Sequence, residues 1–72
     1  MKITQRMKKE LKTLRYANTR NYMYHLDINY YDGSAYLRRL PMKFIRHQST
    51  AIIDGWETIM EVDLINDEWR AR

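Results

Sequence analysis

The sequence contains no cysteine. It therefore excludes disulfide bonds and thiolate metal sites, which are common supports of very small folds. A chain of 72 residues buries only about 60% of the surface that it exposes when unfolded, so its stability is marginal without further help. That help commonly comes from oligomerisation or from a bound partner. A chain without cysteine also suits a reducing compartment, and we expect a cytoplasmic location.

Long apolar runs are lacking as well. No run approaches the roughly 20 residues that a membrane span requires, and the first six residues lack the apolar segment of a secretory signal. We therefore expect no membrane contact. Both glycines of the chain follow an aspartate, so a glycine-rich phosphate loop is excluded. The length leaves no room for a second domain, and residues 1–72 are expected to form a single small one.

A β-hairpin is predicted around Asp32-Gly33. This pair lies between two runs of alternating character and favours a type I′ turn, in which both central residues have positive φ. A two-residue turn there places Asp27 opposite Arg38, so opposite charges meet across the strands. The same register gathers apolar and aromatic residues on one face: Tyr22, Tyr24, Leu26, Ile28, Tyr30, Ala35 and Leu37.

A second hairpin is predicted around Asp54-Gly55, again between extended runs. A two-residue turn at this point places Arg46 opposite Asp63. Residues 43–48 stay ambiguous, because their apolar spacing fits either a strand or one helical turn.

Residues 4–17 predict an amphipathic helix, with Thr4 as a possible N-cap. Its apolar residues recur at spacings of four, four and three and form a narrow stripe: Ile3, Met7, Leu11 and Leu14. After the second hairpin, Asn66 can begin at most a frayed helical turn. The expected fold class is α+β, with one N-terminal helix packed on a four-stranded antiparallel meander of two consecutive Asp-Gly hairpins.

The charges are divided unevenly along the chain. Residues 1–46 contain eleven Lys and Arg and three Asp and Glu, a net charge of +8, whereas residues 47–69 contain six acids and no Lys or Arg. Such asymmetry can steer a charged partner, or the two halves can neutralise each other across the sheet.

The predicted helix concentrates positive charge. Four basic residues lie away from its apolar stripe and are candidates for phosphate binding: Lys8, Lys9, Lys12 and Arg15. The alternative is a surface helix whose basic side chains are merely solvated. In either case, replacing these residues is expected to leave the packing intact.

Residues that could support catalysis are not gathered in the sequence. His25 and His47 lie in different predicted hairpins without further ligands nearby, so we expect neither a metal site nor a cofactor. Ser34 lacks the sequence context of a nucleophile elbow. We therefore expect that the protein is not an enzyme.

One predicted helix cannot cover both faces of the predicted sheet, so the outer face is expected to stay uncovered. Aromatic, apolar and arginine residues fall on it and form a candidate partner-binding surface: Tyr31, Tyr36, Arg38, Phe44, Arg46, Ile52 and Ile59. Apolar groups exposed in a patch usually mark an interface, and we expect a homodimer or a tight protein partner. Aromatics beside arginines also stack single-stranded bases in several folds, so nucleic acid is a possible partner.

These observations favour a small non-enzymatic binding protein, an inhibitor or adaptor that docks on a larger host protein or complex, such as one that handles nucleic acid. Its size and lack of motifs are common among proteins encoded by phages and mobile elements. The alternative hypothesis is a nucleic-acid-binding regulatory protein that uses the basic helix and the Tyr36/Arg38 face.

Overall fold

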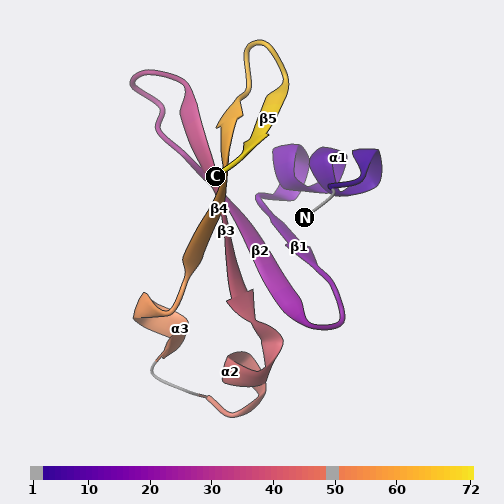
Figure 1. Ribbon diagram of the computed structural model, residues 1–72, viewed down its shortest axis with the longest axis vertical. Coiled ribbons are helices and arrows are strands. Elements are labelled where there is room, and N and C mark those ends of the chain that lie inside the picture. Colours follow the sequence, from indigo (N-terminus) through magenta and orange to yellow (C-terminus); the bar gives the residue numbers. More distant parts are fainter. Residues whose placement is uncertain (1–2, 49–50) are drawn as a thin grey trace.

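The computed structural model describes residues 3–48 and 51–72 (Figure 1). The elements follow the chain in this order: α1 (Gln5–Leu14), β1 (Tyr16–Asn18), β2 (Tyr22–Ile28), β3 (Ser34–Pro41), α2 (Met42–Arg46), α3 (Ala51–Asp54), β4 (Glu57–Asp63) and β5 (Glu68–Ala71). The strands form one antiparallel sheet in the order β1-β2-β3-β4-β5. The α+β class is therefore confirmed, but the sheet has five strands rather than the four expected.

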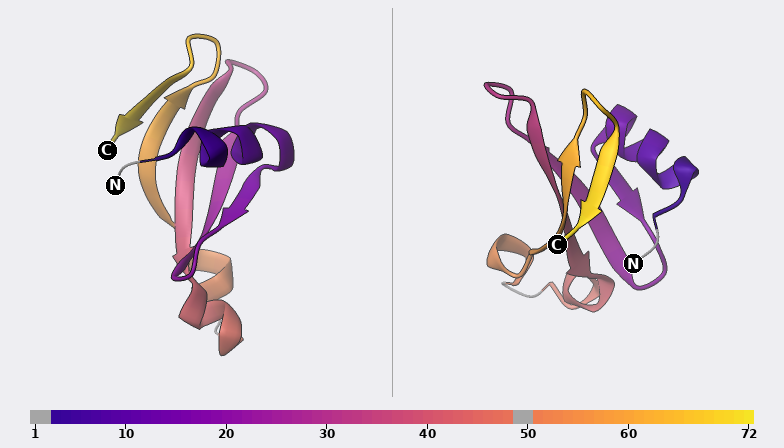
Figure 2. Two further views of the ribbon diagram at one scale, coloured as in Figure 1. Left: turned by 90° about the vertical axis from the view of Figure 1, so that its right-hand side faces the viewer. Right: turned by 45° about the horizontal axis from the view of Figure 1, so that its top comes forward.

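The helix α1 lies across one face of the sheet (Figure 2, left). Thr4 is its N-cap, and its Oγ1 accepts a hydrogen bond from the backbone N–H of Met7 at 3.2 Å. The helix ends three residues earlier than expected, because Arg15 adopts a left-handed conformation with φ of 70°. The backbone N–H of Arg15 donates to the carbonyl of Leu11, which closes the last turn. The chain then enters β1, one of two strands that the sequence did not predict.

The main core lies between α1 and the sheet. Leu11 is fully buried on the helix, and Ile3 and Met7 pack partly buried beside it, as the apolar stripe predicts. Leu14 instead remains 67% exposed. The sheet contributes seven buried residues from four strands: Ala17, Tyr24, Leu26, Ala35, Leu37, Met60 and Val62.

The predicted hairpin of β2 and β3 exists, but its turn is longer than two residues. The backbone N–H of Asn29 donates to Ser34 O at 2.8 Å, and that of Gly33 donates to Asn29 O at 2.9 Å, so residues 30–33 form the loop. Gly33 has a φ of 74°, whereas Asp32 is not among the residues with positive φ. Side chains favour this longer loop, because Asn29 Oδ1 accepts from Tyr31 N and Asp32 Oδ1 accepts from Ser34 N.

The longer loop shifts the pairing by two residues. Asp27 lies opposite Tyr36 rather than Arg38, and Ile28 lies opposite Ala35. A shift of two preserves the side-chain faces, so the predicted division into two faces is confirmed for the paired residues. Tyr30 is the exception, because it falls in the loop and is largely exposed.

The predicted hairpin at Asp54-Gly55 is wrong. After Pro41 the chain forms α2 and α3, and β4 pairs with β3 instead of with residues 43–53. The helical alternative for residues 43–46 is confirmed by α2. Since β4 aligns Asp63 with Ser34, the expected Arg46–Asp63 pairing does not form.

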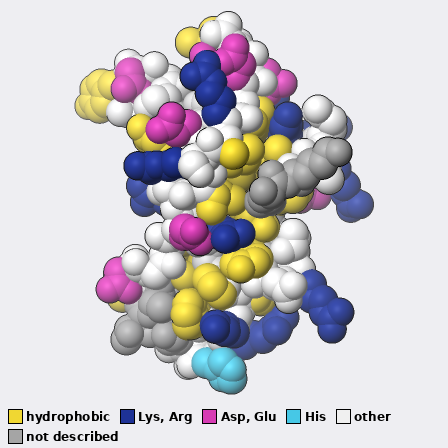
Figure 3. All heavy atoms as spheres, in the orientation of Figure 1, with side chains coloured by type: hydrophobic (Ala, Val, Ile, Leu, Met, Phe, Trp, Pro, Cys, Tyr) yellow, Lys and Arg dark blue, Asp and Glu magenta, His cyan; other side chains and the backbone are white. Residues whose placement is uncertain are grey.

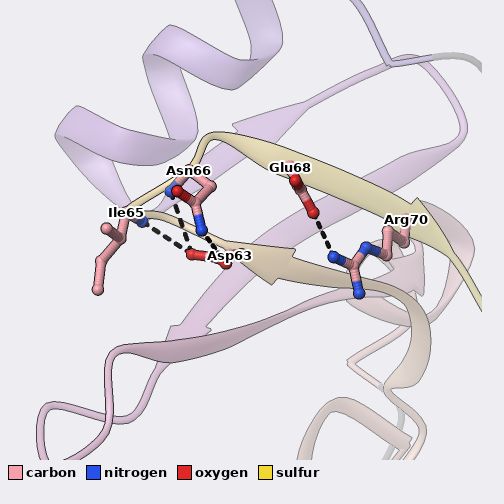
Figure 4. Close-up of polar contacts among 5 residues, drawn as sticks. All are labelled: Asp63, Ile65, Asn66, Glu68 and Arg70. Carbon is pink, nitrogen blue, oxygen red and sulfur yellow. Dashed lines mark hydrogen bonds and ion pairs between the residues drawn. The ribbon is translucent and has the colours of Figure 1, made fainter.

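The chain ends in a strand rather than in a helical turn. The carboxylate of Asp63 accepts hydrogen bonds from the backbone N–H of Ile65 at 3.0 Å and from the backbone and side-chain nitrogens of Asn66 at 3.2 and 2.9 Å (Figure 4). Asp67 then adopts a φ of 54°. This tight turn returns the chain along β4 as β5, so the frayed helical turn expected from Asn66 does not form.

Candidate protein-interaction surface

The sheet face opposite α1, which we term the open face, carries no covering layer over most of its area among the described residues. Figures 1 and 2 show α1 on the other side and the short helices α2 and α3 at one end. The register places Tyr16, His25, Arg38 and Thr58 in one row across the open face. The next row contains Asp27, Tyr36, Glu61 and Arg70.

Three aromatic rings adjoin one another on the open face. The rings of Tyr16 and His25 stack at a centroid distance of 4.5 Å, and Trp56 meets the edge of His25 at 6.0 Å. Trp56 Nε1 donates to the carbonyl of Ile52 at 2.8 Å, which fixes the indole beside α3. We term the rings of Tyr16, His25 and Trp56 the aromatic row. Tyr16 is 48% exposed, so the aromatic row offers a rigid surface to a partner.

The electrostatics keep the centre of this row neutral. Partial burial lowers the pKa of His25 below 6.5; the neighbouring Asp27 carboxylate opposes this shift, and the Arg38 guanidinium adds to it. The imidazole is therefore uncharged at neutral pH and can stack as an apolar ring.

A paired charge lies next to the aromatic row. Arg38 Nη2 lies 3.4 Å from Asp27 Oδ2, and both side chains are about half exposed. Tyr36 stands beside this pair in the adjoining row and is 37% exposed. A tyrosine next to a partly exposed arginine is a common arrangement at protein-binding hot spots.

The open face deepens into a cleft of about 310 Å³ between the β2–β3 loop and the β4–β5 turn. Its polar lining carries both signs of charge: Asp32, Glu61, Asp63 and Arg70. Hydrogen bonds from Ser34 lower the pKa of Asp32, and those from Asn66 lower the pKa of Asp63, so both carboxylates are ionised at neutral pH. Arg70 contacts Glu68 on the same strand (Figure 4).

The structure brings together only part of the predicted partner-binding set. Tyr36 and Arg38 share the open face. Tyr31 lies fully exposed in the β2–β3 loop, and Ile52 lies on α3. The placement of Ile59 on the outer face is wrong, because a register shift between β3 and β4 turns it toward the main core, where it packs partly buried.

The outer-face prediction required Phe44 and Arg46 to lie on a strand, but the structure places neither of them on one. Both belong to α2, where Lys43 Nζ lies 5.3 Å from the Phe44 ring and Arg46 Nη2 donates to the carbonyl of Arg20 at 3.2 Å. Tyr16 was not predicted on this face, because it fell inside the predicted helix. Trp56 was not predicted there either, because the predicted hairpin placed it on the inner face.

Two basic residues of α1, Lys8 and Lys12, contact the far edge of the sheet. Lys12 Nζ lies 2.6 Å from Asp67 Oδ1, and Lys8 Nζ lies 5.7 Å from the ring centroid of Trp69. The guanidinium of Arg15 donates to the carbonyl of Lys12. Lys8 and Lys12 therefore make contacts with the β4–β5 side of the sheet, whereas Lys9 is exposed.

Comparison with protein-family models, with curated proteins and with solved structures found no match for this chain. No helix in residues 3–48 and 51–72 is long and apolar enough to cross a membrane. Within the same ranges, no group of three or more His, Asp or Glu side chains is placed to hold a metal ion.

Proposed function

We propose that the protein is a small non-enzymatic binding protein of the cytoplasm, an inhibitor or adaptor that docks on a larger protein through its open face. The observation that carries this proposal is the uncovered aromatic row next to Tyr36 and the Asp27–Arg38 pair. Tyr, Trp and Arg are the residues most enriched among interface hot spots. The backbones of Tyr16, His25, Tyr36 and Arg38 lie on paired strands, so this part of the surface is already ordered before a partner binds.

The charges favour a protein over a nucleic acid as the docking partner. A surface that tracks a phosphate backbone presents many cations of one sign. The open face instead alternates acids with bases, as in Asp27 beside Arg38 and Glu61 beside Arg70. The lysines Lys8 and Lys12, which a polyanion would need, already contact the β5 side of the molecule. The basic balance of the whole chain remains compatible with a partner that itself handles nucleic acid.

Direct binding of single-stranded nucleic acid is the second candidate, and the aromatic row favours it, since each exposed ring can stack a base. Binding to a mixed oligonucleotide separates the candidates. If the protein docks on protein, oligonucleotide binding is weak, and a variant with Lys8, Lys9, Lys12 and Arg15 replaced by alanine changes it little. Sub-micromolar, steeply salt-dependent binding that this variant loses would reverse the order of the two candidates.

The main test is site-specific crosslinking. A photoreactive phenylalanine replaces Tyr36 on the open face or Leu14, an exposed residue of α1 on the opposite layer. In nuclease-treated lysate, we expect a discrete crosslinked protein from position 36 and none from position 14. With that partner purified, Tyr36→Ala and Arg38→Ala should each weaken binding by about 10-fold or more, whereas Leu14→Ala should leave it within about twofold. Equal crosslinking from both positions, or products that disappear with nuclease, would contradict the proposal.

A further inference from the structure

The strand β5 forms one edge of the sheet and pairs only with β4 among the described strands. The backbone N–H of Arg72 donates to Ile59 O at 3.0 Å, in register with the β4–β5 pairing. Hydrogen-bonding directions alternate along an antiparallel strand, so Glu68 and Arg70 also direct their backbone groups toward β4. The N–H and C=O groups of Trp69 and Ala71 therefore point away from the sheet.

This edge lacks several of the usual protections against pairing with another strand, although it is short and carries two charged side chains. Natural edges are commonly blunted by lysine, proline or a bulge. The strand Glu68–Ala71 contains neither lysine nor proline, and its pairing with β4 is regular. In the left view of Figure 2, β5 lies at the left side, which is the side turned toward the viewer in Figures 1 and 3. Figure 3 shows that hydrophobic side chains on this side form a band flanked by charges of both signs.

We propose that β5 pairs antiparallel with β5 of a second copy of this chain, in a two-fold symmetric register centred on Trp69. Trp69 then lies opposite Trp69 of the second copy and exchanges both backbone hydrogen bonds with it, as the outward direction of its groups requires. In the same register Glu68 lies opposite Arg70 of the second copy, and the symmetry repeats this pair. The edge is therefore complementary to itself in both backbone direction and charge.

The charges also select this register over its nearest alternative. The outward backbone groups permit a pairing shifted by two residues and centred on Arg70. That pairing places the two Arg70 guanidinium groups directly opposite each other, and like charges in this position are destabilising. The register centred on Trp69 instead extends the contact that Arg70 already makes with Glu68 within its own strand.

The dimer is expected to be weak, because two strands of four residues bury much less than the roughly 1,600 Å² of a standard interface. A dissociation constant on the order of 100 μM is consistent with such a contact. The inference does not depend on the proposed function. It is compatible with it, because Glu68 and Arg70 lie on the open-face side and pairing would join two open faces into one ten-stranded sheet.

Sedimentation equilibrium from about 10 μM to about 1 mM tests the dimer through charge reversal. The wild-type mass should rise from 8.9 kDa toward twice that value. Glu68→Arg and Arg70→Glu should each weaken self-association by about 10-fold or more. An equimolar mixture of these two variants should associate again, because every cross-strand contact then joins opposite charges. The double variant E68R/R70E should also associate, because it restores opposite charges in the register centred on Trp69. Lys9→Glu, on the exposed side of α1, is the matched control and should behave as wild type.

A backbone substitution tests the edge independently of charge. Ala71→Pro removes an N–H that points away from β4 and lies opposite Asp67 of the second copy in this register, so we expect it to weaken dimerisation while circular dichroism shows a folded monomer. Should this variant fail to fold, the exposed charge reversals still decide the question. A wild-type protein that stays monomeric to 1 mM would overturn the proposal. So would a dimer that persists in both single charge reversals, or a mixture of the two that remains monomeric.

Discussion

Truncating Leu11 should remove much of the stability of the domain. Its side chain is fully buried between α1 and the sheet. Leu-to-Ala substitutions at such sites cost about 2–5 kcal/mol, and we expect about 3 kcal/mol because a surface helix can partly settle into the space. A chain of 72 residues has a total stability of about 4–11 kcal/mol. Leu11→Ala should therefore cost between a quarter and three quarters of the free energy of unfolding.

Leu14 provides a matched control on the same helix. It is 67% exposed, so Leu14→Ala removes little buried area and should cost less than about 0.5 kcal/mol. Urea unfolding, followed by far-UV circular dichroism and tryptophan fluorescence, measures the loss of unfolding free energy in both variants. With a slope of about 1 kcal/mol per molar urea for a small domain, the midpoint should fall by about 3 M for Leu11→Ala. A Leu11→Ala cost below about 1 kcal/mol, or equal costs for both variants, would refute the description of α1 as a helix held by Leu11.

Gly33→Ala should destabilise the protein by about 1 kcal/mol in urea unfolding, because Gly33 has a φ of 74°. Gly55 has no positive φ, so Gly55→Ala should be neutral or stabilising. A larger loss from Gly55→Ala than from Gly33→Ala would contradict the observed turns. Burial lowers the pKa of His25, so its contribution to stability is present above about pH 6.5 and is lost as the pH falls below that value. Unfolding from pH 8 to 5 should show this loss in wild type and not in His25→Gln, and identical pH profiles would contradict it. A double-mutant cycle with Lys12→Ala and Asp67→Ala should give a coupling free energy of about 0.2–1 kcal/mol, which decreases with salt because both side chains are partly exposed. A coupling free energy of zero would show that this contact does not stabilise the packing of α1 against the β4–β5 turn.

The period-two pattern predicted which residues face the core, but not which residues pair. Tyr24, Leu26, Ala35 and Leu37 are buried together as expected, although the hairpin register is shifted by two. The pattern is insensitive to such a shift, because alternate residues keep their faces. The loop length depended instead on side-chain hydrogen bonds such as the one from Tyr31 N to Asn29 Oδ1, which turn propensities do not fix.

The second hairpin failed for a different reason. The alternation of residues 57–63 correctly predicts a strand with Met60 and Val62 facing inward. It does not reveal which strand is the neighbour, and in the structure that neighbour is β3. The candidate site was only partly predictable for the same reason. Tyr36 and Arg38 are two residues apart on one strand, and their shared face follows from the sequence. Tyr16 and Trp56 reach the open face from other segments, whose placement depends on the tertiary fold.

The uneven charge of the chain acquires a physical meaning in the folded sheet. Lys12 pairs with Asp67, and Arg39 pairs with Glu57 at 3.1 Å, so basic residues of the first half contact acids of the second. Because β4 lies beside β3, the two halves partly neutralise each other, as one of the two sequence interpretations expected. These pairs add little to the long-range field, so what remains to steer a partner is the net charge of +4. Short-range contacts such as those around Arg38 should then set the specificity of recognition, and the net charge should act mainly on the association rate.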